Sequence, residues 1–133
     1  MASELEPAQS FQADPARLRT VVSDDRAVAV CERCEIAERP AHRLRGLLGR
    51  SGLEPGAGLL LRPSNSIHTC FMRFPIDAVF LDAELRVLRV RSELRPWRAA
   101  WARGSRAVLE LAAGEAERRG VRPGERLRLA PAG

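Results

Sequence analysis

The sequence has no lysine and no tyrosine, and aromatic residues make up only 5% of its 133 positions. No stretch approaches the roughly 20 apolar residues that a membrane span needs, so we expect no membrane partner. The first residues lack the basic segment and the apolar segment of a signal peptide, and we therefore predict a cytoplasmic protein. Three cysteines, an odd number, argue against a disulfide framework and fit a reducing compartment.

Motifs typical of enzymes are also missing. The sequence contains no G-x-S-x-G elbow, no G-x-G-x-x-G loop, no Walker loop and no H-E-x-x-H metal motif. We therefore expect no cofactor. The sequence leaves open whether the protein catalyses a reaction. It favours a protein without catalytic activity.

The composition that is present fits one small folded domain. Hydrophobic residues make up 45% and charged residues 29%, which excludes a disordered chain or a fibre. A length of 133 residues predicts one domain, because single domains usually have about 100–150 residues. Residues 1–16 carry two prolines and no periodicity, so we predict a disordered tail there and a single β-rich domain over residues 17–133. We expect a monomer.

Short β-branched or apolar runs separated by turn residues recur along this domain. The pattern predicts seven or eight short strands, which is typical of a small sandwich or barrel rather than of βαβ units. A short helix is predicted over 39–52 and a helical turn over 114–120, while 95–105 is predicted as an irregular connection or a short helix. The predicted strands cover residues 20–22, 26–37, 58–62, 67–74, 76–82, 85–94, 106–114 and 125–130.

Positive charge is concentrated in one segment. All 22 basic residues are arginine, which GC-rich coding alone can produce, but residues 86–106 hold seven arginines against one acid. That segment has a formal net charge of +6, whereas the rest of the chain has a net charge of −1. Arginine binds phosphates and indole stacks on bases, so Trp97 and Trp101 within the segment suggest weak nucleic-acid binding. Alternatively, the two tryptophans form one face of a helical turn that packs on the core.

The sulfur-bearing residues suggest metal or redox chemistry only weakly. Cys31 and Cys34 form a C-x-x-C pair, but no second ligand pair accompanies it. Because the pair follows a strand pattern, the two thiols should point to opposite faces, and we predict structural cysteines without a metal. His68, Cys70 and Met72 alternate in a predicted strand, so their side chains point to one face. This pattern fits either a set of copper ligands or three core side chains.

A cluster of polar residues is predicted around Pro75. If this proline bends a hairpin, Arg73 and Asp77 flank it closely enough to form a structural ion pair. An enzymatic alternative makes His68 a general base that Asp77 or Glu110 orients, in a hydrolase-like reaction. Otherwise Glu110, within an alternating strand pattern, is an ordinary carboxylate that faces solvent.

Four strings of the sequence resemble the domain-of-unknown-function family one-ninety-two, an uncharacterised conserved family of bacteria and archaea. The resemblance spans roughly residues 28–129. It implies a compact sandwich or jelly-roll-like barrel with short helices, and it implies no established activity, substrate or cofactor. The matching strings are Arg45-Gly46-Leu47 with Arg50, His68-Thr69 with Met72-Arg73 and Pro75-Ile76-Asp77, Pro96-Trp97-Arg98, and Val108 to Gly114.

These observations favour a small non-catalytic binding domain for a small anionic or polar ligand or for an acidic partner. Two alternatives stay open: the hydrolase-like enzyme, and a weak nucleic-acid-binding accessory that uses residues 86–106. Truncation of His68 to alanine is expected to leave stability nearly unchanged and to damage ligand binding. The predicted site residues are Arg45, Arg50, His68, Arg73, Asp77, Trp97 and Glu110, with no metal ligand among them.

Overall fold

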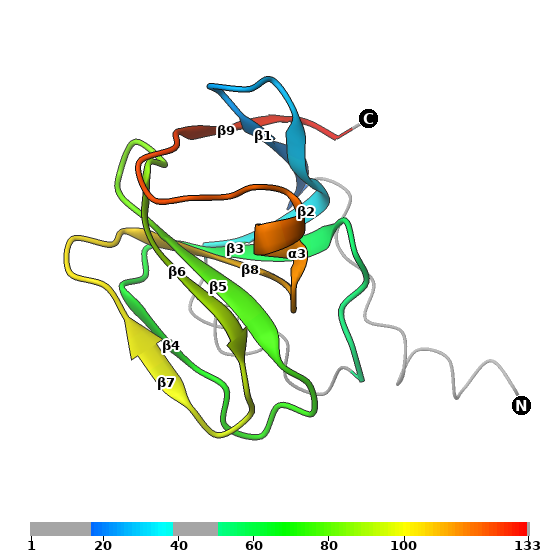
Figure 1. Ribbon diagram of the computed structural model, residues 1–133, viewed down its shortest axis with the longest axis vertical. Helices are drawn as coiled ribbons and strands as arrows, with labels where there is room; N and C mark the ends of the chain where they lie inside the picture. The colour runs from blue at the N-terminus through cyan, green and yellow to red at the C-terminus, as the bar shows by residue number, and fades with distance from the viewer. Residues whose placement is uncertain (1–16, 39–50, 133) are drawn as a thin grey trace, which may run out of the picture.

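The computed structural model describes residues 17–38 and 51–132 (Figure 1). The predicted tail over 1–16, most of the predicted helix over 39–52, and the candidate residues Arg45 and Arg50 lie outside the described residues. The described elements are β1 (Leu18–Ser23), β2 (Ala29–Ala37), β3 (Ala57–Leu61), β4 (Ser66–His68), β5 (Ile76–Leu81), β6 (Val87–Leu94), β7 (Ala99–Trp101), β8 (Ala107–Ala112), α3 (Glu115–Arg118) and β9 (Leu127–Pro131).

Seven of the strands form one mixed sheet in the order β6-β5-β8-β3-β2-β1-β9. Only β2 and β3 run parallel, and the other neighbours are antiparallel. The residues just before the edge strands β6 and β9, Arg86 and Arg126, form one isolated bridge, so the described sheet curls without closing into a barrel. The prediction of a mainly β fold is therefore confirmed, with nine described strands instead of seven or eight.

The central strands of the sheet are buried on both faces. Along β5, Val79 and Leu81 belong to one hydrophobic core, while Ala78 and Phe80 belong to a second core on the opposite face. The first core is covered by α3, whose Ala116 is fully buried in it. Burial on both faces explains why β5 is apolar at every position except Asp77.

The second core is covered by a two-stranded ribbon of β4 and β7, at the lower left of Figure 1. Ile67 of β4 and Ala100 of β7 point inward and join Phe80 in this core. The prediction of one strand over 67–74 is wrong, because β4 ends at His68 and the chain turns through Phe71, whose φ is +68°. The segment predicted as an irregular connection or helix instead supplies β7.

The two cysteines of the C-x-x-C pair lie together, so the prediction that their thiols diverge is wrong. Arg19 pairs with Cys34 and Val21 with Cys31, so three steps along β2 oppose two along β1. This β-bulge brings both cysteines into the first core. The neighbouring Cys31 thiol and burial raise the pKa of Cys34 well above its usual value, which makes it a poor nucleophile.

Two further properties concern membranes and metals. No helix within the described ranges is long and apolar enough to cross a membrane. Within the same ranges, no group of three or more histidine, cysteine or acidic side chains could hold a metal ion.

Candidate functional site

Two loops meet at one end of the β4–β7 ribbon, and Thr69 joins them. Its main-chain N–H donates to the carbonyl of Arg98 (2.8 Å), and its carbonyl accepts from the N–H of Trp97 (3.0 Å) and of Met72 (3.1 Å). Its hydroxyl donates to the carbonyl of Arg95 (2.6 Å) and accepts from the N–H of Arg98 (2.9 Å). Because Thr69 is fully buried, these bonds fix both loops in one arrangement.

This arrangement exposes two aromatic rings. Phe71 is 70% exposed and Trp97 is 57% exposed, and their ring centroids lie 4.6 Å apart with the planes tilted by 60°. Both residues have a positive φ, +68° for Phe71 and +64° for Trp97. Such a conformation costs a non-glycine residue about 1–3 kcal/mol and persists only where the surroundings enforce it. The fold therefore holds two large apolar side chains in water on a strained backbone.

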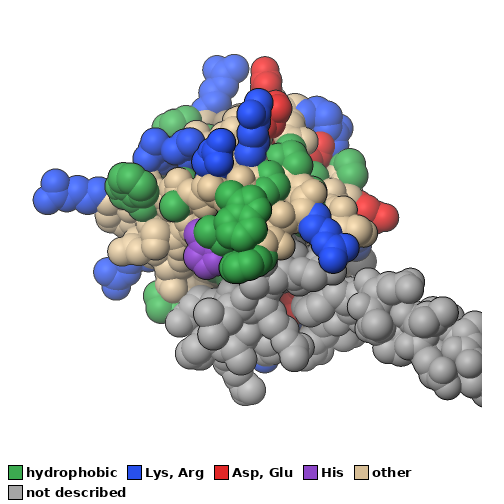
Figure 2. Space-filling model, turned by 90° about the horizontal axis from the view of Figure 1, so that it is seen from below, with side chains coloured by type: hydrophobic (Ala, Val, Ile, Leu, Met, Phe, Trp, Pro, Cys, Tyr) green, Lys and Arg blue, Asp and Glu red, His purple; other side chains and the backbone are tan. Residues whose placement is uncertain are grey.

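Histidine and arginine side chains accompany the aromatic pair. His68 is exposed, and its Nδ1 accepts from the main-chain N–H of Cys70 (3.3 Å), which leaves Nε2 to an outside partner. Figure 2 shows the histidine beside the central hydrophobic patch of this face, with arginine side chains farther out. We name the following residues of the two loops and their flank the aromatic–arginine surface: His68, Phe71, Arg73, Arg95, Trp97 and Arg98.

The three arginines of this surface are available for an external acid. Arg73, Arg95 and Arg98 are all exposed, and none of them forms an ion pair with an acidic residue in the described part of the chain. The guanidinium of Arg98 donates only to the carbonyl of its neighbour Trp97 (3.3 Å). A guanidinium retains bidentate donors for a carboxylate in this situation. The surface thus combines an apolar centre with a positive rim.

Asp77 does not belong to this surface. It is fully buried, and its Oδ1 accepts from the main-chain N–H of Glu93 (2.7 Å) while its Oδ2 accepts from that of Ala116 (2.8 Å). The predicted ion pair between Arg73 and Asp77 is therefore wrong. The reason is that β6 and α3 supply main-chain donors to both oxygens of the carboxylate, while Arg73 points into solvent.

Glu110 is separated from both His68 and Asp77. It is 5% exposed, so the prediction of a solvent-facing carboxylate is wrong, because β8 is a central strand buried on both faces. Its cross-strand neighbours Leu59 and Ala78 belong to the second core, whereas Asp77 faces α3 beside the first. His68 lies on the outward face of the ribbon. The structure thus does not assemble these three residues into a hydrolytic site.

The arginines of segment 86–106 spread over the molecule instead of forming one stripe. Arg86 donates to the carbonyl of Gly124 (2.7 Å) at the start of β6, and Arg98 follows the far end of that strand. Eight residues of β-strand separate these ends by roughly 25 Å. Both Trp97 and Trp101 are more than half exposed, so the predicted helical face packed on the core is wrong.

The sequence did not single out Phe71 and Thr69 as candidate site residues. A phenylalanine in a predicted strand indicates a core position, and a positive φ leaves no trace in hydrophobic periodicity. The only available signal was their place in the His68–Asp77 string that resembles the family. Three predicted site residues, His68, Arg73 and Trp97, are exposed and lie on the two segments that Thr69 joins, and their role stays a prediction.

The family comparison covers most of the chain. The model of the DUF192 family, described as "Uncharacterized ACR", matches residues 20–129, which include both loops of the aromatic–arginine surface. The chain belongs to the DUF192 family. The family carries no established activity, so membership leaves the function of this DUF192 protein to be argued from its own surface.

Two solved structures share the fold of this DUF192 protein. A protein of unknown function from Novosphingobium aromaticivorans is 24% identical, with a TM-score of 0.73 over 91% of this chain and 95% of that one. A Sinorhizobium meliloti protein described as a "putative transcription regulator" is also 24% identical, with a TM-score of 0.76 over 90% of this chain and 98% of that one. At this identity the similarity establishes the fold alone. The chain matches no protein with a curated description.

Proposed function

We propose that this DUF192 protein is a non-catalytic binding domain whose aromatic–arginine surface docks an acidic protein partner. The observation that carries the proposal is the aromatic pair Phe71 and Trp97, held outward on strained backbone by the buried Thr69. Protein interfaces are enriched in aromatic residues and arginine at their centres, and few such residues supply most of the binding energy.

The chemistry of the rim supports an acidic partner. Arg73, Arg95 and Arg98 present positive charge without an acid of their own among the described residues. Complementary charge accelerates association and rejects partners of the wrong sign. A small ligand on rings that are more than half exposed would keep much of its own surface in water, and a protein segment covers them better.

Single-stranded nucleic acid is the second candidate, because exposed tryptophan and arginine also suit stacked bases. The ring geometry favours a protein partner instead. Planes tilted by 60° offer no parallel platform on which two successive bases can stack. In addition, the arginines of residues 86–106 follow the whole length of β6 rather than one groove.

Three further properties belong to the same proposal. The separation of His68, Asp77 and Glu110 supports binding without catalysis. The odd number of cysteines supports the cytoplasm as the compartment. We propose a monomer in solution, which sedimentation of the full chain at two concentrations would test.

The proposal is tested by selecting peptides from a random library on the full chain and measuring Kd by calorimetry. We expect selected peptides with acidic residues around an aromatic or aliphatic anchor. Substitution Trp97→Ala should weaken binding roughly 30-fold, which is the size of an interface hot spot. The matched control is Trp101→Ala, which removes a tryptophan that is also more than half exposed but lies outside the surface.

Two further arms separate the candidates. Substitution His68→Ala should weaken peptide binding while the urea midpoint stays that of the unmodified chain. A single-stranded oligonucleotide should bind weakly, with an affinity that falls steeply as salt rises. Selected peptides without acidic residues, or an oligonucleotide that binds tightly at high salt and requires Trp97, would contradict the proposal.

A further inference from the structure

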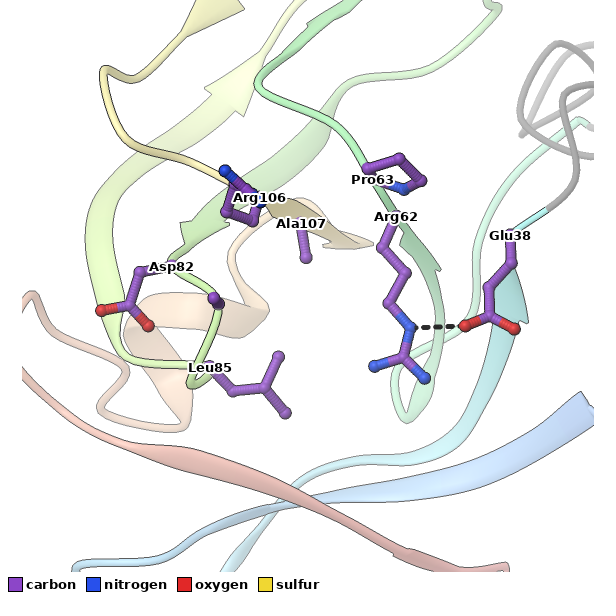
Figure 3. A pocket seen from close by; sticks show the side chains of 8 residues that line it. Glu38, Arg62, Pro63, Asp82, Leu85, Arg106 and Ala107 are labelled. Atoms are coloured by element: carbon purple, nitrogen blue, oxygen red, sulfur yellow. Dashed lines mark hydrogen bonds and ion pairs between the residues drawn. The ribbon is translucent and has the colours of Figure 1, made fainter.

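A cavity of about 320 Å³ opens where the end of β3, the turn between β5 and β6, and the start of β8 come together (Figure 3). Small-molecule sites occupy roughly 300–1,000 Å³, so the cavity is large enough for a small organic ligand. Its lining contains no residue of the aromatic–arginine surface. The cavity is therefore separate from that surface.

One wall of the cavity is a rigid turn. The Oδ1 of Asp82 accepts from the main-chain N–H of Glu84 (2.9 Å) and of Arg86 (2.8 Å). The N–H of Leu85 donates to the Asp82 carbonyl (3.0 Å), and the carbonyl of Leu85 accepts from Leu127 (2.9 Å). These bonds hold Leu85 at a φ of +65°, which a branched side chain disfavours. The turn is thus preformed, and its Leu85 side chain lines the cavity.

Arg62 supplies a carboxylate-binding group on the opposite side. Its Nε donates to Oε2 of Glu38 (2.9 Å), and its side chain is 36% exposed. Within the described residues, its Nη1 and Nη2 have no partner. Figure 3 shows the guanidinium extended across from Leu85, with these terminal nitrogens directed away from Pro63. A guanidinium offers a second edge with two parallel N–H donors, which suits one carboxylate.

Arg106 supplies a second positive charge. Its main-chain N–H donates to Leu81 (2.7 Å) and its carbonyl accepts from Ser64 (3.0 Å), so its backbone is fixed. Its side chain is exposed and makes no ion pair with any acid in the described ranges. The two positive charges of Arg62 and Arg106 equal the two negative charges of Glu38 and Asp82, so the residues that line the cavity carry no net charge. A neutral balance disfavours a multiply charged phosphate and fits a ligand with a single negative charge.

We propose that this cavity binds a small organic acid with one carboxylate and a short aliphatic body. The carboxylate pairs with the free edge of Arg62, and the exposed side chain of Arg106 adds a second positive charge to the lining. The aliphatic body packs against Pro63, Leu85 and Ala107, which supply the apolar part of the lining.

The test is an NMR titration of the full chain with isovalerate, with isovaleramide as its uncharged analogue and inorganic phosphate as the alternative anion. We expect saturable shifts of the Leu85 and Ala107 amides at millimolar isovalerate. Isovaleramide and phosphate should bind at least about tenfold more weakly, because a charge-assisted bidentate contact is lost or mismatched. Equal affinity for isovaleramide, or tighter binding of phosphate, would overturn the proposal.

Substitution of each arginine completes the test. Arg62→Gln should weaken isovalerate binding at least roughly tenfold. Arg106→Gln should weaken it by a smaller factor, roughly threefold, because it removes a nearby charge. If Arg62→Gln fails to fold, Arg106→Gln alone tests the proposal. The Arg106 side chain forms no hydrogen bond or ion pair with another described residue, so its substitution should not unfold the protein. The controls are Arg122→Gln, an exposed arginine outside the cavity, and Trp97→Ala, and both should leave isovalerate binding unchanged. Unchanged binding in Arg106→Gln would overturn the proposal.

Discussion

Asp77 shows how one buried carboxylate can support a surface that it never reaches. Its two oxygens accept main-chain N–H groups from Glu93 at the end of β6 and from Ala116 in α3. Glu93 itself has a φ of +51° and precedes the loop that carries Trp97. By fixing Glu93, Asp77 helps to set where this loop leaves the sheet. Its role is therefore structural, although its place in the family-like string suggested a site residue.

Substitution Asp77→Asn should lower the free energy of unfolding by about 1–3 kcal/mol, which urea denaturation measures. The amide keeps one acceptor oxygen but turns an NH₂ group toward the second main-chain donor, so one buried N–H loses its partner. The control is Asp24→Asn, at a half-exposed ion pair with Arg128 (3.3 Å), which should cost less than about 1 kcal/mol. Equal midpoints for Asp77→Asn and the unmodified chain would contradict this role.

Substitution Phe71→Gly should leave the free energy of unfolding unchanged or slightly higher. Glycine removes the strain of a φ of +68°, worth about 1–2 kcal/mol, and this gain offsets the greater freedom of the unfolded chain. Leu88 in β6 is the control, because Leu88→Gly has no such strain to relieve and also removes a partly buried side chain, so it should cost more than about 1 kcal/mol. Similar losses in both variants would show that the backbone at Phe71 is not strained.

At the scale of elements, hydrophobic patterns predicted the strands that pack in the sheet. The apolar runs of β5 and β8 were located to within one or two residues at each end, because burial dictates their composition. The patterns failed at the ribbon, where β4 and β7 are three residues each and two of the three side chains in each strand face water. They also failed at the bulge in β2, since one inserted residue reverses the alternation on which the prediction rests.

The short helix α3 is attached to β2 by a chain of ion pairs. Glu115 accepts from Arg118 (2.6 Å) and from Arg119 (3.1 Å), and Arg119 reaches Glu32 of β2 (2.9 Å). The hydrogen bond from Arg118, with further help from Arg119, lowers the pKa of Glu115 against the opposing effect of burial. The bond from Arg119 likewise lowers the pKa of Glu32.

These shifts predict how stability depends on pH. Because the folded pKa of Glu115 lies below its unfolded value of 4.5, its contribution is complete above pH 4.5 and is lost as the pH falls below that value. In Glu115→Gln, the free energy of unfolding should therefore be lower at neutral pH and should decline less steeply on acidification. Urea denaturation between neutral and acid pH measures this difference.

The matched control for that experiment is Glu117→Gln in the same helix. Glu117 is exposed, and its side chain forms no hydrogen bond or ion pair with another described residue. Its substitution should leave both the stability at neutral pH and the acid decline unchanged. An acid decline that is identical in Glu115→Gln and in the unmodified chain would show that the ion pairs of α3 contribute nothing.

At the scale of the whole molecule, composition and pattern were enough to predict the mainly β fold and the family. They also singled out three of the exposed residues that we group in the aromatic–arginine surface: His68, Arg73 and Trp97. They could not show that Asp77 and Glu110 lie on opposite faces of the sheet, because this depends on strand order. For the same reason, arginines that cluster in the sequence are distant in space.

The proposed function places the binding of a partner on the aromatic–arginine surface. Amide chemical-shift mapping of the labelled full chain with a selected acidic peptide tests it most directly. If the partner binds this surface, the largest amide shifts fall on residues 68–73 and 95–98 and disappear in Trp97→Ala. The largest shifts on β1 and β9, or shifts that persist unchanged in Trp97→Ala, would contradict it.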